Sequence, residues 1–313
     1  ACRVHEQGGD GGGADVHDSK SGVAHFHMPS EKECFKKVRD LIAILPPCYE
    51  EGLIHKNTAS LPAYNEGVTF NDDLAHVIPE HSNQSYDIHD VIDGIVDPSS
   101  FIEVQEEFAR NVVVGFGRLK GVAVGIIADQ PKYMAGVLDC DSSDKAARFI
   151  RYCDAFNIPI ITLTDVPGFL PGKDQEYKGI IRHGAKIVYA FAEATVPKLT
   201  VITRKAYGGA YIVMNSKQTG ADVNFAYPSA EIAVMGAEGA VNILFRKADA
   251  ETKGKELEAY KEKFATPYQA AELGFIDEII YPRQTRKRLI QALEMTENKM
   301  QTNPPKKHGN MPL

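Results

Sequence analysis

Two glycine-rich segments in this sequence are candidates for a functional site. One is TDVPGFLPG at 164–172, and the other is KAYGGAYIVM at 205–214. Each follows an apolar run and precedes or opens a helical pattern, where glycine lets a main-chain N–H approach a ligand closely or adopt a positive φ. The unpaired N–H groups and the dipole at a helix start favour a negatively charged oxygen. An ordinary tight turn between strand and helix remains an open alternative.

The two segments are more informative together than apart. If the strands before them are neighbours, both segments lie at the same end of the sheet and line one crevice. Neither segment matches GxxxxGK[ST] or GxGxxG, so nucleotide binding through those motifs has no support. The sequence therefore suggests an anion site made of main-chain N–H groups.

Few side chains in the sequence are candidates for a catalytic role. The sequence contains no GxSxG or HExxH motif and no cysteine in a known catalytic setting. His183 is more typical of a helix surface than of a general base, and Asp165, beside Val-Pro-Gly, is more typical of a residue that fixes a turn. A reaction in which main-chain N–H groups stabilise an oxyanion, while a cofactor transfers the proton, would leave such a sequence.

Composition and charge argue against several classes of protein. The net charge is −7 and the isoelectric point is near 5.8, whereas a nucleic-acid protein needs a basic face. Five scattered cysteines without CxxC pairs favour neither a metal site nor a disulfide framework, and fit a reducing compartment. No apolar run approaches the roughly 18 residues of a membrane span, and the start lacks a secretory-signal pattern. We expect a cytoplasmic protein that is not itself transmembrane.

From residue 86 onward the pattern predicts an α/β fold. A helix is expected at 86–97, followed by a hairpin of two strands over 112–129 that turns at Lys120-Gly121. Helices and strands then alternate, which is typical of helix crossovers between parallel strands. The expected elements are helices at 143–156, 179–195, 209–217 and from 239 onward, and strands at 158–164, 198–203, 222–226 and 231–234. In the helix at 179–195 the predicted buried face consists of Ile181, Ala185, Val188 and Ala192, with Ile187 and Phe191 beside it.

The beginning of the chain is organised differently. A strand pattern at 22–28 precedes a helix whose predicted N-cap is Ser30, with Glu33 completing a capping box. The predicted apolar face of this helix comprises Phe35, Val38, Leu41, Ile42 and Leu45. We predict a domain remnant at 1–47, a linker at 48–85 and a domain at 86–313. Because the start lacks Met and lies in a glycine-rich loop, we expect the chain to begin part-way through a longer protein.

The sequence as a whole resembles a known family, the carboxyltransferase subunits of biotin-dependent acyl-CoA carboxylases. The family includes propionyl-CoA and acetyl-CoA carboxylases, methylmalonyl-CoA carboxyltransferase and methylmalonyl-CoA decarboxylase. The resemblance covers nearly everything from about residue 15 to the end. The matching stretches are SGVAHF, QPKYMAGVLD, SSDKAARFIRYCDAFNIPIITLTDVPGFLPG, EYKGIIRHGAKIVYAFAEATVPKLTVITRKAYGGAYIVM, YPSAEIAVMGAEGAV and KKHGNMPL.

The resemblance implies a crotonase-type fold, a spiral of ββα units, with two such domains per subunit and hexameric assembly. The active sites would lie between the N-terminal domain of one protomer and the C-terminal domain of another. This chain is similar to the tail of the first domain followed by a complete second domain. The part that holds most of the acyl-CoA and stabilises the thioester enolate is absent from the sequence, and this departs from the family.

For the chemistry, the resemblance implies that the N–H groups of Gly209 and Ala210 stabilise the ureido oxygen of biotin as carboxybiotin releases CO2. The freed ureido nitrogen would remove the α-proton of the acyl-CoA, so no side-chain base is needed. Tyr207 and Gly208 would also contact biotin. No lysine stands in an AMKM-like setting, so biotin would arrive on a separate carrier protein or domain.

Three further residues have roles implied by the same resemblance. Gly168 and Phe169 would form a wall on the biotin side of the site. Ile212 occupies a position at which the family varies with acyl chain length, and it would shape the acyl pocket, although a core isoleucine is an alternative. No metal is implied.

Three functions remain open. The first is carboxyl transfer from carboxybiotin to propionyl-CoA or acetyl-CoA, with a biotin carboxyl carrier protein and a biotin carboxylase subunit as partners. The second is the reverse direction, methylmalonyl-CoA decarboxylation with a membrane decarboxylase subunit. The third is an assembly or binding module without turnover. In a eukaryote the expected compartment would be the mitochondrial matrix.

Overall fold

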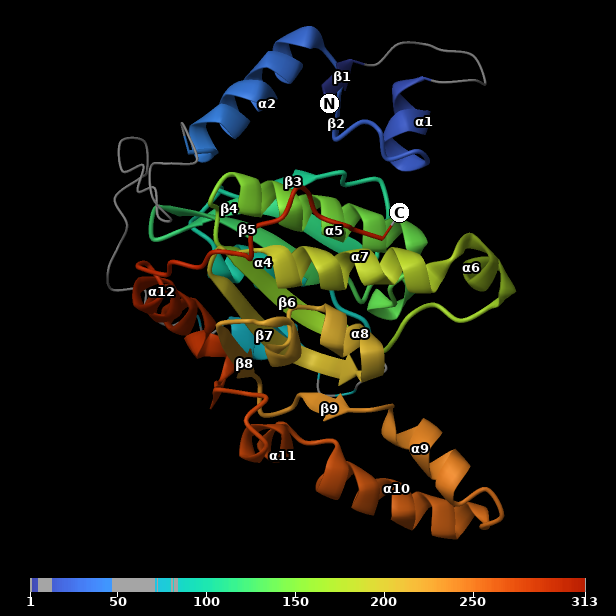
Figure 1. Cartoon of the computed structure of the whole chain (residues 1–313). Coiled ribbons are helices and arrows are strands. Elements are labelled where there is room, and N and C mark those ends of the chain that lie inside the picture. Colours follow the sequence, from blue (N-terminus) through green and yellow to red (C-terminus); the bar gives the residue numbers. More distant parts are fainter. Residues whose placement is uncertain are drawn as a thin grey trace.

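The centre of the protein is a mixed β-sheet, shown in Figure 1, a computed structural model that describes residues 2–4, 13–46, 71, 73–79, 81 and 84–312. Within these residues the sheet has eight strands in the order β10-β8-β7-β6-β5-β4-β3, and β9 pairs with the end of β7. The strands from β5 to β10 pair in parallel, and β4 runs antiparallel to both of its neighbours, β5 and β3. The strands are β3 Ile102–Val104, β4 Val112–Leu119, β5 Val122–Asp129, β6 Ile160–Val166, β7 Lys198–Tyr207, β8 Val223–Ala226, β9 Glu231–Ala233 and β10 Glu278–Ile279.

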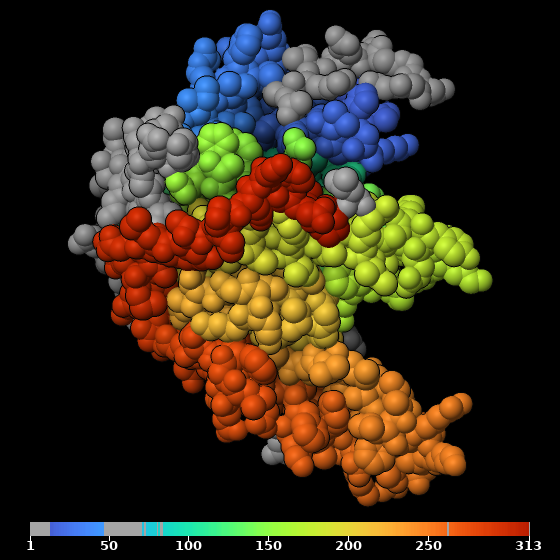
Figure 2. All heavy atoms as spheres, viewed as in Figure 1, coloured from blue at the N-terminus to red at the C-terminus, as the bar shows by residue number. Residues whose placement is uncertain are grey.

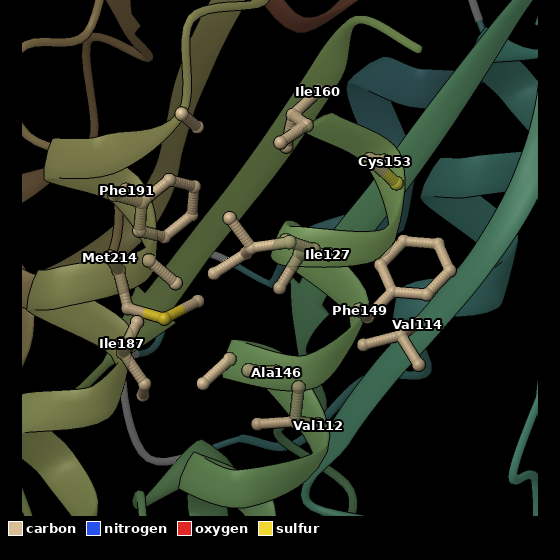
Figure 3. Close-up of a cluster of buried hydrophobic side chains, with 14 of the residues drawn as sticks. Val112, Val114, Ile127, Ala146, Phe149, Cys153, Ile160, Ile187, Phe191 and Met214 are labelled. Atoms are coloured by element: carbon tan, nitrogen blue, oxygen red, sulfur yellow. The ribbon is translucent and has the colours of Figure 1, made fainter. Parts of the chain in front are cut away.

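Helices cover both faces of this sheet. On one face α5 (Cys140–Ala155) and α7 (Ile180–Glu193) enclose an apolar core with alternate residues of β4, β5 and β6. Figure 3 shows Phe149 of α5 and Phe191 of α7 in this core, close to Ile127 of β5. On the other face α4 (Ile88–Ile95) and α12 (Thr285–Met295) pack on the intervening strand residues. Because both faces are covered, β4 to β6 are buried along their whole length and read as continuous apolar runs.

The predicted hairpin at 112–129 is confirmed. β4 and β5 pair antiparallel from Val112↔Asp129 to Leu119↔Val122. Both turn residues have positive φ, 54° at Lys120 and 79° at Gly121, which is the geometry that tight hairpins favour. The carboxylate of Asp97 accepts hydrogen bonds from both turn N–H groups, at 3.0 and 2.8 Å, so the turn is capped from outside the hairpin.

Several boundaries differ from those predicted. α5 begins at Cys140 rather than near 143, because the side chain of Asp139 accepts a hydrogen bond from the N–H of Ser142 and caps the helix. β7 extends to Tyr207 because its last residues pair with β9. The short helix α6 (Lys173–Lys178) was not predicted, and α8 (Gly208–Val213) is shorter than predicted, with a 3-10 turn at Lys217–Thr219 after it. The remaining helices are α9 Ala237–Leu244, α10 Ala250–Phe264 and α11 Pro267–Glu272, and shorter 3-10 turns occur at Met134–Gly136 and Pro282–Gln284.

The predicted buried face of α7 was wrong at Ile181, which is 79% exposed. Ile187 and Phe191, predicted to lie beside that face, are buried, and so is Ile180. The helix begins directly after Gly179, whose left-handed conformation closes α6, and this turn sets the rotation of α7 against the sheet. Figure 2 shows residues near the C-terminus, in red, lying across the outside of α7, and the ammonium of Lys306 lies 2.7 Å from the carboxylate of Glu193.

The N-terminal region forms a separate layer above α5 (Figure 1) and comprises β1 (Cys2–Val4), α1 (Ala14–Ser19), β2 (Phe26–Met28) and α2 (Glu31–Ile44). The predicted N-cap is confirmed, since the Ser30 side chain accepts a hydrogen bond from the N–H of Glu33. Only part of the predicted apolar face of α2 is covered, because Leu41 and Leu45 pack on the core whereas Phe35 and Ile42 are 53% and 67% exposed.

Most of the predicted linker at 48–85 lies outside the described residues. Its described part includes α3 (Leu74–Val77), whose Leu74 is buried against the α4 side of the core. No helix among the described residues is long and apolar enough to cross a membrane.

Candidate active site

The two glycine-rich segments lie side by side. They follow β6 and β7, which are parallel neighbours paired from Ile160↔Lys198 to Val166↔Ala206. Both segments therefore leave the sheet at the same edge, as the sequence predicted. Two independent turns are placed where they can face one ligand.

The bend after β7 is very tight, because Tyr207 ends the strand and Gly208 begins α8 with no loop between them. Gly208 has a φ of 57°, which L side chains rarely adopt. A Cβ at this position would also lie 2.8 Å from the carbonyl oxygen of Val234. Both the conformation and the close approach therefore require glycine at 208.

Gly209 and Ala210 present free donors at this bend. Their N–H groups belong to the first turn of α8, where the helix itself supplies no acceptor. Neither N–H has a hydrogen-bond partner in the part of the chain that the structure describes. Gly209 is exposed, and a Cβ built on it would meet no atom within 4 Å, whereas the Ala210 side chain is anchored in the core at 1% exposure. An open surface carrying two unpaired N–H donors suits an oxyanion.

The segment after β6 is pinned to the rest of the domain. The N–H of Leu138 donates to the carbonyl of Gly168 at 3.1 Å, and the N–H of Leu170 donates to the carbonyl of Leu138 at 2.7 Å. The ring of Phe169 lies against α7, so close that a Cβ on Gly184 would come within 2.8 Å of it. Gly168 and Phe169 are both half-buried, and they form a rigid flank next to the bend.

A buried ion pair joins the two strand ends. The Asp165 carboxylate accepts from Nε of Arg204 at 3.0 Å and from the N–H of Lys205 at 3.1 Å. Burial raises the pKa of the Asp165 carboxyl, and the charge of Arg204 acts in the opposite direction. Asp165 was predicted to fix a turn through main-chain hydrogen bonds, and it does accept such a bond, but from the neighbouring strand.

Next to this pair lies a second buried carboxyl group, which no sequence motif indicated. Asp129, at the end of β5, accepts from the N–H of Asp165 at 3.1 Å. Its other oxygen has no hydrogen-bond partner in the described structure, and burial raises its pKa well above the ordinary value.

His183 lies on the surface of α7. Its Nδ1 is 2.9 Å from the carboxylate of Asp144 on α5, and Lys186 pairs with the same carboxylate at 2.8 Å. This ion-pair cluster joins α7 to α5, which agrees with the interpretation of a helix-surface histidine.

Tyr207 and Ile212 flank the bend in different ways. The Tyr207 hydroxyl donates to the carboxylate of Glu231 on β9, and burial together with this bond raises its pKa, so the hydroxyl remains a donor. Ile212 is half-buried and packs beside Ile202 and Ile232. No motif in the sequence pointed to Glu231, since it is a single acidic residue in a three-residue strand.

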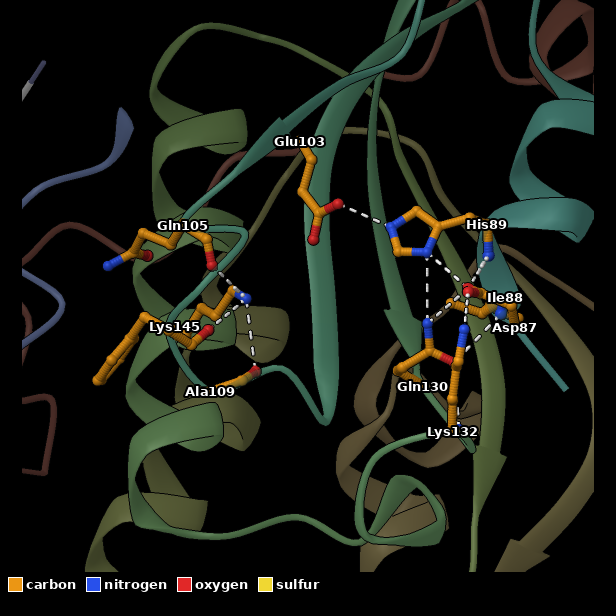
Figure 4. A network of polar contacts seen from close by, with 10 residues as sticks. Asp87, Ile88, His89, Glu103, Gln105, Ala109, Gln130, Lys132 and Lys145 are labelled. Carbon is orange, nitrogen blue, oxygen red and sulfur yellow. Dashed lines mark hydrogen bonds and ion pairs between the residues drawn. The ribbon is translucent and has the colours of Figure 1, made fainter. Parts of the chain in front are cut away.

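Figure 4 shows a polar network near the carboxyl end of β5, also missed from the sequence. The two ring nitrogens of His89 lie 2.6 Å from Asp87 and 2.7 Å from Glu103. These acceptors, Glu103 first, raise the pKa of His89 to about 9. The network borders a cavity of about 310 Å³ that Gln130 and Lys132 also line. A larger cavity of about 490 Å³ lies between β2, α2 and α5.

Comparison with known proteins identifies the family. The carboxyl transferase domain family matches residues 6–311, so the chain belongs to it. It is 53% identical to the propionyl-CoA carboxylase carboxyltransferase subunit of Haloferax mediterranei, over 96% of the chain and 59% of that protein. It is 52% identical to the methylmalonyl-CoA decarboxylase alpha subunit of Veillonella parvula, over 97% of the chain and 58% of that protein.

Among solved structures, the transcarboxylase 12S hexamer core with methylmalonyl-coenzyme A and methylmalonic acid bound superposes with a TM-score of 0.90 at 48% identity, covering 96% of this chain and 58% of that one. The predicted crotonase-type fold is therefore confirmed. The chain spans less than three fifths of the length of these curated relatives and solved structures.

Proposed function

We propose that this chain supplies the biotin-binding half of a carboxyltransferase site, at which a carboxyl group moves between carboxybiotin and a short-chain acyl-CoA such as propionyl-CoA or acetyl-CoA. The observation that carries the proposal is the open bend at which the N–H groups of Gly209 and Ala210 have no partner among the described residues. The relatives named above are subunits of enzymes that act on propionyl-CoA and methylmalonyl-CoA.

The residues present fit biotin, because its ureido oxygen needs donors and this bend offers two without a side chain in the way. Biotin, when bound, supplies the nitrogen that carries the carboxyl group. The N–H groups of Gly209 and Ala210 would hold the ureido oxygen and stabilise negative charge on it. Gly208 keeps the bend tight, and the Phe169 flank with Gly168 would limit where the ring can lie.

Specificity for the acyl group is proposed for Ile212. It lies two residues after Ala210 on the same short helix, and its side chain is half-buried rather than fully enclosed in the core. An apolar side chain there would contact the acyl chain, and this contact is favourable because it removes apolar surface from water. It would therefore favour short apolar acyl groups.

For domain organisation, we propose that residues 1–47 belong to a first carboxyltransferase domain and residues 86–313 form the second. The exposed apolar side chains of α2 support this division, since such a stripe is normally covered by another layer. We also propose assembly into a hexamer that works with a biotin carboxyl carrier protein. Exposed Val234, Ile243 and Leu244, near or on α9, support an interface close to the bend.

The direction of transfer has two candidates. The similarity to a propionyl-CoA carboxylase subunit and to a methylmalonyl-CoA decarboxylase subunit is almost equal, at 53% and 52% identity. Carboxylation would require a biotin carboxylase partner, and decarboxylation would require a membrane decarboxylase subunit. Copurification from the source cell, with the partner identified, distinguishes the two.

The test of the proposal uses a chimera in which this chain replaces the matching segment of the Haloferax mediterranei subunit. Biotin-dependent decarboxylation of methylmalonyl-CoA and malonyl-CoA is measured for the chimera, for its Gly209→Pro variant and for the 313-residue chain by itself. Loss of one of the two N–H donors should reduce the chimera's rate by about 100-fold or more. A chimera that is inactive beside an active parent, or a fully active Gly209→Pro variant, would refute the assignment.

The same experiment examines the inert-module alternative. If the chain acts only in assembly or binding, the chimera folds and assembles but shows no turnover. If the chain alone turns over as fast as the chimera, that alternative is excluded.

A further inference from the structure

The segment after β8 contacts the glycine bend at three points. β9 pairs in parallel with the end of β7, with Lys205 opposite Glu231 and Tyr207 opposite Ala233. Beyond the strand, the carbonyl of Val234 lies against Gly208. The bend therefore leaves the sheet beside a short strand, β9, which pairs with β7 and lies off the main strand path.

The third contact is made by the side chain of Tyr207. Its hydroxyl donates to the Glu231 carboxylate, and its ring lies 3.2 Å from where a Cβ on Gly236 would be. Tyr207 is thus held at both ends, by its main chain in the sheet and by its hydroxyl on β9. It is also the residue immediately before the bend, so its orientation sets the peptide planes that follow.

Within the bend, Gly209 contributes few restraints of its own. Gly209 has no side chain, is exposed and has open space around its Cα, and its N–H has no partner among the described residues. The direction of the Gly209 and Ala210 N–H groups therefore depends on what holds Tyr207 on one side and the buried Ala210 methyl on the other.

We propose that Glu231 is a positioning residue for the site, acting through the Tyr207 hydroxyl to aim the N–H groups of Gly209 and Ala210. This inference rests on the proposed function. Oxyanion donors act only when they point to where the charge develops, and small displacements of such groups lower rates steeply. Their effect falls on the chemical step rather than on binding of the acyl-CoA.

The test compares Tyr207→Phe, Glu231→Leu and Glu231→Gln in the chimera described above. Tyr207→Phe and Glu231→Leu each remove the hydrogen bond, so kcat should fall about 10-fold or more while KM for methylmalonyl-CoA stays within about 2-fold. Glu231→Gln keeps an acceptor oxygen for the hydroxyl and should retain most of kcat. The double variant Tyr207→Phe/Glu231→Leu should lose no more than either single variant, because both act on one bond.

The matched control is Tyr227→Phe, which removes the hydrogen bond between the Tyr227 hydroxyl and Thr285, 2.7 Å long, in the core on the α12 side of the sheet. It should leave kcat unchanged. If Tyr207→Phe keeps the wild-type kcat, if Tyr227→Phe lowers kcat equally, or if Glu231→Gln is as slow as Glu231→Leu, the proposal is wrong.

The outcome separates this inference from the function on which it rests. If only the positioning role is wrong, Tyr207→Phe is fully active while Gly209→Pro is not. If the chimera has no biotin-dependent activity at all, both proposals are overturned.

Discussion

The guanidinium of Arg204 lies 3.0 Å from the carboxylate of Asp165, and this buried pair ties the end of β7 to the end of β6. The same guanidinium donates to the carbonyl of Gln84 at 2.6 Å and lies over the ring of Tyr86, 4.9 Å from its centroid. The two strand ends that present the glycine-rich segments are thus joined by charge as well as by sheet hydrogen bonds.

Arg204→Met should strongly destabilise the protein, because it leaves the Asp165 carboxylate buried without its counterion. We expect the free energy of unfolding to fall by about 3 kcal/mol or more, measured by urea denaturation. The double variant Arg204→Met/Asp165→Leu should recover much of that loss, since neither charge then remains. Ordinary surface substitutions change the free energy of unfolding by no more than about 0.5 kcal/mol. A change within this range for Arg204→Met would contradict the role of the pair.

Gly208 and Gly209 should respond in opposite ways to alanine. Gly208→Ala places a Cβ 2.8 Å from the Val234 carbonyl at a φ of 57°, and should cost about 1–3 kcal/mol of stability. Gly209→Ala meets no atom within 4 Å and should be neutral or stabilising by up to about 1 kcal/mol. Thermal unfolding of the two variants side by side checks this, and equal effects would show that the bend is not constrained as described.

Gly184→Ala should disturb the flank of the site from a distance. The added methyl would come within 2.8 Å of the Phe169 ring, which must move away from α7. We expect a loss of about 1–3 kcal/mol from overpacking. A companion Phe169→Leu change should relieve part of it. If the losses of unfolding free energy in the two single variants simply add up in the double variant, the result would argue against this contact.

His89 should make stability depend on pH. Its pKa is raised from 6.5 to about 9 by Glu103 and Asp87. Because the pKa of His89 is higher in the folded state than in the unfolded state, its contribution to the free energy of unfolding is complete below about pH 6.5. This contribution is lost as the pH rises toward 9. Around the same cavity Glu106, Arg110 and Lys132 also carry charge, and the last pairs with Asp87 at 3.1 Å.

The measurement compares wild type with His89→Gln by urea denaturation between pH 6 and 10. The difference in unfolding free energy should be largest at the acid end and should shrink through this window. His308→Gln, which changes an exposed histidine near the C-terminus and outside this network, is the matched control. A difference that grows with pH would have the wrong sign for the proposed network.

The local features of this protein could be predicted from its sequence. Ser30 and Glu33 specify a helix start, Lys120-Gly121 specifies a hairpin turn, and the glycines after two apolar runs specify tight exits from neighbouring strands. Each of these signals depends on residues within a few positions of one another. The family resemblance also came from the sequence, because its long motifs are contiguous.

Contacts between groups that are distant in the sequence could not be predicted, because they depend on how whole elements pack together. Nothing near Glu231 in the chain indicates that it accepts a hydrogen bond from Tyr207, and nothing near His89 indicates Glu103 as its partner. The buried face of α7 was mispredicted for the same reason, since Ile180 and Ile181 are equally apolar and only docking against the sheet chooses between them. The sequence pattern indicates which residues can be buried or paired. The packing of whole helices and strands determines which of them are buried or paired in the folded protein.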